Sequence, residues 1–145
     1  MRVKLGTMKK LALLFFLGSC LLAAPSCKKF VDKQKENYLL GIMTDGRWYL
    51  QLYKENGVDS SYLFSTYEFQ FYKDEKVDAI NGASVTGGTW KGNISDLSMS
   101  SNFPTAQDPV KRLNHTWKVT DYYVDAVFAE VNTPSGVVSI LLRKK

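Results

Sequence analysis

The chain has 145 residues, of which 45% are hydrophobic and 13% aromatic, and its formal net charge is +5. Four of the 19 basic residues and none of the 14 acidic ones precede residue 27, so the rest of the chain is close to neutral and carries no basic stripe of the kind that nucleic-acid binders show. The remaining length suffices for one domain with its own core and is too short for two ordinary domains.

The first 26 residues have the layout of a secretory signal peptide. They begin with four basic residues, Arg2, Lys4, Lys9 and Lys10. An almost uninterrupted apolar stretch follows over residues 11–24, and it is shorter than the roughly 20 apolar residues that a membrane-spanning helix needs. A basic start, a short apolar core and small residues before a boundary are typical of a cleaved signal. We therefore predict a signal peptide over residues 1–26.

Two cysteines, Cys20 and Cys27, each end a segment that resembles the lipobox read by signal peptidase II. The segment before Cys20 fits the general consensus better, but the residues after Cys20 are still apolar. Cys27 is followed by Lys28 and Lys29, where the polarity changes abruptly. Because nothing covers a membrane tether, it should be polar. We therefore predict acylation at Cys27, with Cys20 as the alternative, and a tether over residues 27–37.

The segment after the tether predicts one small all-β domain over residues 38–145. Polar residues over 33–37 precede apolar residues over 38–42, which can cover one end of a core, and this short amphipathic stretch predicts one or two helical turns. Alternating apolar and polar residues then predict strands, and Asn-Gly pairs at residues 56–57 and 81–82 predict tight turns between them. The expected strands cover residues 47–53, 66–72, 77–80, 85–93, 97–99, 113–121, 123–131 and 138–142.

These eight short strands, joined without helical crossovers, favour an eight-stranded up-and-down antiparallel barrel. An open sandwich of two sheets is the alternative. Gly87 and Gly88 predict a bulge or bend inside a strand, and residues 101–112 form the longest candidate for an irregular loop. In the first strand, Trp48 and Leu50 are placed on the core face, while Tyr49 and Tyr53 are placed on the opposite face.

The order of the aromatic motifs resembles that of the lipocalin-like lipoproteins of Bacteroidetes. The motifs are Gly46-Arg47-Trp48, Tyr67-Glu68-Phe69-Gln70-Phe71, Gly88-Thr89-Trp90 and the run from Leu113 to Val119. The resemblance covers about residues 38–144 and implies a calyx-type barrel that holds a small apolar molecule, with no catalytic residues. In this group acidic residues after the acylated cysteine are associated with surface display. Lys28 and Lys29 in those places favour a periplasm-facing position at the outer membrane.

The leading functional hypothesis is therefore a lipid-anchored module that binds a small apolar or amphipathic ligand. Its candidate ligand-binding residues are Trp90, Trp117, Tyr67, Phe69 and Phe71. Trp48 is expected to pack across a barrel end. The alternative is a protein-interaction module, an inhibitor or an accessory subunit that works through exposed tyrosines such as Tyr49 and Tyr53.

No pattern in the sequence predicts an enzyme, a metal site or a cofactor. His115 is the single histidine, and a general base needs a partner that orients it. The predicted domain contains no cysteine, which argues against zinc. Asp74, Glu75 and Asp78 lack the glycine-punctuated spacing of a calcium loop.

Overall fold

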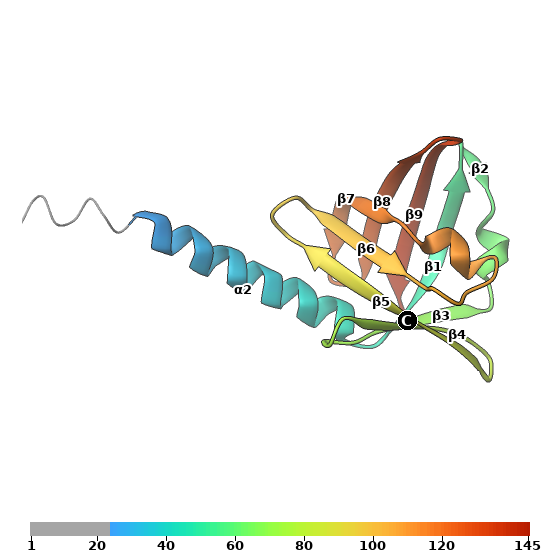
Figure 1. The fold of residues 1–145 in the computed structure, drawn as a ribbon, viewed down its shortest axis with the longest axis horizontal. Coiled ribbons are helices and arrows are strands. Elements are labelled where there is room, and N and C mark those ends of the chain that lie inside the picture. The colour runs from blue at the N-terminus through green and yellow to red at the C-terminus, as the bar shows by residue number, and fades with distance from the viewer. Residues whose placement is uncertain (1–23) are drawn as a thin grey trace, which may run out of the picture. The chain divides into compact units, whose positions relative to one another are not determined.

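The computed structural model describes residues 24–145, with side chains from residue 31 onward (Figure 1). The predicted signal peptide up to residue 23, together with Cys20, lies outside the described residues. The chain divides into two compact units, Met1–Gln34 and Lys35–Lys145. In the first unit the described residues are helical, and Cys27 is one of them. Every buried hydrophobic residue among those described lies between Met43 and Leu142, so the second unit contains the core.

The described elements consist of one α-helix, two short 3-10 helices and nine strands. Their bounds are α2 (Ala24–Thr44), β1 (Arg47–Glu55), β2 (Val58–Asp59), η2 (Ser61–Phe64), β3 (Tyr67–Phe71), β4 (Lys76–Asn81), β5 (Ser84–Asn93), β6 (Ser98–Asn102), η3 (Val110–Leu113), β7 (Thr116–Tyr123), β8 (Ala126–Thr133) and β9 (Gly136–Lys144). The predicted helix is present, and it extends through the residues for which a tether was predicted.

Eight of the strands form a closed antiparallel barrel, which confirms the predicted fold. Consecutive strands pair from β3 to β9, and β1 pairs with both β3 and β9. Figure 1 shows β1 beside β9, where the sheet closes on itself. The two-residue strand β2 pairs only with β1 and lies outside this ring. Closure leaves no free sheet edge in the ring, and it excludes the open sandwich.

The alternating residue pattern places large side chains inside the barrel, but two β-bulges change its phase. In β1 the pairing with β9 shifts between Leu50 and Leu52, and Tyr53 is consequently buried. In β7 the pairing with β8 shifts between Val119 and Asp121. A bulge adds one residue to a strand, and every later side chain then changes face. The prediction that Tyr53 lies on the outer face is therefore wrong.

At Gly87 and Gly88, where the sequence predicted a bulge or bend, the strand contains no bulge. Both glycines continue the pairing of β5 with β4 without a register shift. Gly88 serves another purpose, because a Cβ atom there would lie 2.6 Å from both the carbonyl oxygen of Asn102 and the ring of Phe103. The missing side chain lets the segment after β6 approach the strand closely.

The segment from residue 103 to residue 113 closes one end of the barrel, which we call the loop end. The sequence predicted an irregular polar loop here, yet the segment buries four apolar side chains, Phe103, Ala106, Val110 and Leu113. Asn114 holds the start of the segment, because its side-chain oxygen accepts a hydrogen bond from the Phe103 N–H at 2.7 Å and its amide donates to the Phe103 carbonyl at 3.2 Å. The loop is therefore part of the core.

Candidate functional site

A cavity of about 200 Å³ lies at the opposite end of the barrel, which we call the helix end. It is lined by the second half of α2, by the β3–β4 and β5–β6 turns, and by the adjoining parts of β5, β6, β7 and β8. The lining residues are Glu36, Asn37, Leu39, Leu40, Met43, Lys73, Glu75, Trp90, Lys91, Gly92, Asn93, Ile94, Leu97, Ser98, Met99, Val119, Tyr122 and Val127. All of them belong to the unit Lys35–Lys145.

Trp90 on β5 is the largest side chain in the lining, and its position is fixed by its neighbours. Its indole N–H donates to the carbonyl oxygen of Tyr72 at 2.9 Å. The ring of Phe71 packs edge-on against it, with ring centroids 5.2 Å apart. Because a buried indole N–H needs an acceptor, the hydrogen bond and the aromatic pair together select one orientation of the ring. Trp90 is thus a rigid apolar wall of the cavity.

The second half of α2 forms the wall opposite the strands. Met43 is buried, and Leu40 packs against the core. The carbonyl oxygen of Met43 accepts the indole N–H of Trp48 at 2.9 Å, which ties the end of the helix to the first strand. Trp48 is completely buried at this end of the barrel, so it packs where the sequence predicted a closing tryptophan. The helix closes this end only in part, because the cavity remains beside it.

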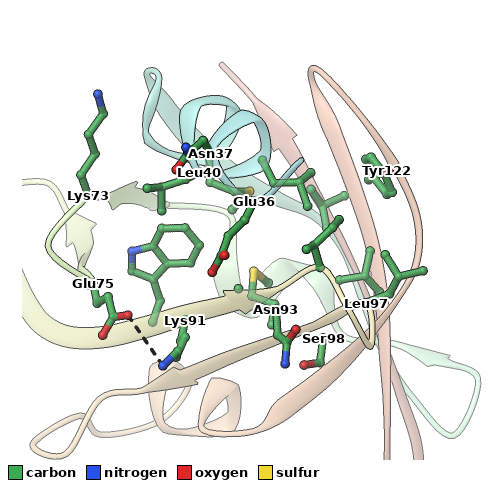
Figure 2. Close-up of a pocket in the computed structure, with 18 residues that line it drawn as sticks. Glu36, Asn37, Leu40, Lys73, Glu75, Lys91, Asn93, Leu97, Ser98 and Tyr122 are labelled. Atoms are coloured by element: carbon green, nitrogen blue, oxygen red, sulfur yellow. Dashed lines mark ion pairs between the residues drawn. The ribbon is translucent and has the colours of Figure 1, made fainter. Parts of the chain in front are cut away.

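Polar side chains surround the apolar part of the cavity. Figure 2 shows Glu36, Asn37, Lys73, Glu75, Lys91, Asn93, Ser98 and Tyr122 in its lining. The ammonium group of Lys91 lies 4.0 Å from the carboxylate of Glu75, and both side chains are well exposed. An apolar interior with a few polar groups at its edge is the usual composition of a small-molecule site.

The interior of the barrel itself is almost filled. A void of about 30 Å³ remains there, bordered by Phe69, Phe71 and Trp117 among other core residues. This volume is about that of one water molecule. The large aromatic side chains that suggested a calyx fill it, and the cavity that could hold a ligand lies at the helix end.

The five candidate ligand-binding residues are therefore not gathered at one site. Trp90 lines the cavity, while Trp117, Phe69 and Phe71 border the small internal void. Tyr67 lines neither, and its ring packs against Phe64 with centroids 6.2 Å apart.

Residues 38–42 were predicted to cover one end of the core, but a helix face that lines a cavity was not predicted. Glu36, Leu39, Leu40 and Met43 follow the spacing i, i+3, i+4 and i+7, which places side chains on one face of a helix. Only one or two helical turns were predicted around residues 33–42, so this spacing was not recognised. It is the signal that could have identified this wall of the cavity.

His115 lies outside this cavity, in the lining of a wide polar depression formed by β5, β6 and β7. Its ring packs edge-on against Trp117, with centroids 5.4 Å apart. Within residues 24–145, no cluster of three or more histidine, cysteine, aspartate or glutamate residues has the arrangement of a metal site.

The aromatic surface suggested by Tyr49 and Tyr53 does not form. Tyr49 is exposed, whereas Tyr53 is 1% exposed and packs against Phe64. Exposed apolar side chains gather instead at the β7–β8 turn, where Tyr122, Tyr123 and Val124 are neighbours in the chain.

The loop end contains a small charged network around Tyr53. Its hydroxyl donates to the carboxylate of Glu55 at 2.7 Å. Arg112 lies 3.2 Å from Glu55 and 3.2 Å from Asp108. Burial, followed by the nearby carboxylate of Glu55, raises the pKa of Tyr53 well above its ordinary value. The network faces the end of the barrel away from the cavity, and we interpret it as structural.

The fold and the cavity define a small closed β-barrel with a helix-covered pocket at one end. The fold is similar to that of a DUF4847 family protein from Bacteroides vulgatus, with a TM-score of 0.55 and 11% sequence identity over 74% of this chain and 97% of that one. No family model matches the sequence, and no curated protein matches it. At this identity the likeness concerns the fold.

No helix in the described part of the chain is both long enough and apolar enough to cross a membrane.

Proposed function

We propose that this protein is an envelope lipoprotein, acylated at Cys27, whose barrel domain binds a small ligand with an apolar body at the helix end. The observation that carries the proposal is the cavity of about 200 Å³ between the helix, Trp90 and the ends of the strands. An engineered apolar cavity of about 150 Å³ binds benzene, and sites for drug-sized ligands begin at about 300 Å³. The ligand, or the part of it that is bound, therefore has the size of one ring or a short alkyl segment.

The proposed anchor rests on the sequence. The polar residues after Cys27 suit a tether, and each acyl methylene buried in a bilayer contributes about 0.8 kcal/mol. Lys28 and Lys29 support a periplasm-facing position at the outer membrane. The membrane is thus the proposed partner of the N-terminus, and a small molecule is the proposed partner of the barrel.

The proposal includes no reaction. The lining of the cavity contains Ser98 but no histidine or cysteine, and the Ser98 hydroxyl donates to the carboxylate of Asp96 in the adjoining turn at 2.6 Å. His115 lines a different depression. We therefore propose binding without catalysis, and no metal or cofactor is part of the proposal.

A cavity-filling variant tests the proposal. Val119→Trp adds a large ring to the β7 wall and should abolish the copurification of a small molecule, detected by native mass spectrometry of protein from the native envelope. The control is Val124→Trp, which adds the same ring at an exposed position outside the lining. Circular dichroism establishes that both variants are folded. A ligand that copurifies equally with both variants would rule out this cavity as its site.

A further inference from the structure

The charged side chains in the lining of the cavity differ in whether they are paired and in where they point. Lys91 is paired with Glu75 at 4.0 Å. Lys73 also belongs to the lining, but Figure 2 shows its side chain extending away from the other labelled residues. Neither lysine directs an unpaired positive charge into the cavity.

Glu36 is arranged differently. Its side chain extends from the helix toward the strand that carries Lys91 and Asn93, and Figure 2 shows its carboxylate among the lining side chains. Among residues 31–145, whose side chains the structure describes, no ion pair or hydrogen bond involves this carboxylate. It is the acidic group at the cavity without a partner in the described part of the chain.

The surroundings of Glu36 determine what it would attract. Leu40, Met43 and Trp90 supply apolar surface in the same cavity. A ligand that covers this surface removes water from the carboxylate, which is costly unless the ligand brings a donor or a positive charge. An ammonium group meets that need with a charge-assisted hydrogen bond, whereas a ligand carboxylate would add repulsion.

We propose that the ligand is a small amphiphilic amine, with its ammonium group at Glu36 and its apolar part against Trp90. This inference rests on the proposed function, since it names the chemistry of a ligand for the same cavity. Glu36 is then the residue that determines specificity for charge, and the apolar lining accepts ligands by size alone.

Three probes of the same length separate charge from size: n-hexylamine, n-hexanol and n-hexanoate. The protein is the chain of residues 27–145, made without export so that Cys27 stays unacylated and kept reduced. It includes the whole unit Lys35–Lys145, which has its own core. The signal of the Trp90 indole N–H in NMR titrations reports binding. We expect hexylamine to bind about three to ten times more tightly than hexanol, and hexanoate more weakly than hexanol.

Two variants with the same change in charge locate the source of the preference. Glu36→Gln should reduce the amine-to-alcohol ratio to within about twofold, because the amide removes the charge of the side chain and keeps its size. The fold should be retained, because Glu and Gln have similar helix propensities and Glu36 is exposed. Asp96→Asn removes a negative charge in the β5–β6 turn, at a residue outside the lining, and should keep the preference.

The outcomes distinguish the two proposals. If none of the probes binds, the proposed function itself fails. If hexanol binds but hexylamine binds no better, or hexanoate binds best, the cavity is a binding site and the inference about Glu36 is overturned. Equal losses of preference in Glu36→Gln and Asp96→Asn would also overturn it, because the preference would then come from the general field of the protein.

Discussion

At Gly88, strand β5 packs closely against the segment that closes the loop end. A Cβ atom at this position would meet the backbone oxygen of Asn102 and the ring of Phe103, each at 2.6 Å. Backbone cannot rotate away as a flexible side chain can, and Phe103 is buried. The contact therefore fixes how closely the loop packs against the barrel.

We predict that Gly88→Ala lowers the free energy of unfolding by about 1–3 kcal/mol, as overpacking of a core typically does. Gly87→Ala is the matched control, since a Cβ atom there would meet only the Asp78 carboxylate at 3.8 Å. Urea unfolding followed by tryptophan fluorescence measures both. Because Ala is more favourable than Gly inside a strand, Gly87→Ala should not destabilise the protein. Equal losses in the two variants would show that the loss at Gly88 does not come from the contact with Phe103.

Tyr53 should make the stability of the folded protein depend on pH in the alkaline range. Burial raises its pKa above the ordinary value of 10.0, with the Glu55 carboxylate acting in the same direction. The folded chain thus keeps a proton that the unfolded chain releases above about pH 10. The stabilising contribution is complete below that pH and decreases as the pH rises above it.

Between about pH 8 and about pH 11 we expect the wild-type protein to lose about 1.4 kcal/mol more stability than Tyr53→Phe. Chemical denaturation at the two pH values measures the difference. The exposed tyrosines Tyr72 and Tyr123 titrate in both proteins and cancel in the comparison. An identical loss in the two proteins would contradict the prediction.

Among the elements, the second half of α2 combines two roles. Met43 and Leu40 complete the core at the helix end, and the Met43 carbonyl satisfies the indole N–H of Trp48. The same residues form one wall of the cavity. Stability and ligand binding therefore depend on the same ten residues, 35–44.

Two truncated chains test this dependence. A chain that begins at residue 35 should unfold at the same urea concentration as one that begins at residue 27. A chain that begins at residue 45 should lose about 2–5 kcal/mol or fail to fold, because it loses a buried Met side chain and leaves the Trp48 indole without its acceptor. Full stability of the shortest chain would mean that the helix is not part of the fold.

The individual strands could be predicted because residue alternation and turn signals depend only on neighbouring residues in the chain. Asn-Gly pairs mark the β1–β2 and β4–β5 turns, and the alternation around Phe69 and Phe71 is preserved in the structure. The bulge after Leu50 was not predictable, since it depends on pairing with β9, a strand nearly ninety residues later in the chain. Because of this bulge, Tyr53 lies in the core and not on the surface where it was predicted.

For the whole molecule, the closed barrel followed from the number of strands and the absence of helical crossovers. The position of the cavity did not, because it depends on how completely the core residues fill the barrel. The same pattern that suggested a calyx supplies Trp117, Phe69 and Phe71 to fill it. Residues 103–113 then close the loop end, and the cavity of about 200 Å³ lies at the helix end, beside the second half of α2.

The anchor is the property of the whole molecule that the sequence predicts most directly, and it has a decisive test. If Cys27 is acylated, Cys27→Ser should abolish the incorporation of an alkyne-labelled fatty acid in cells and release the protein from the membrane fraction. Cys20→Ser should leave both unchanged, because Cys20 would lie within the cleaved segment. A mature chain that began at Cys20 would carry the apolar residues 21–24 into its tether, where no other part of the protein is expected to cover them.

The reverse pattern, with labelling lost only in Cys20→Ser, would move the acylation site and lengthen the tether by seven residues. Loss in neither variant would remove the lipid anchor from the proposed function while leaving the ligand cavity as a separate question.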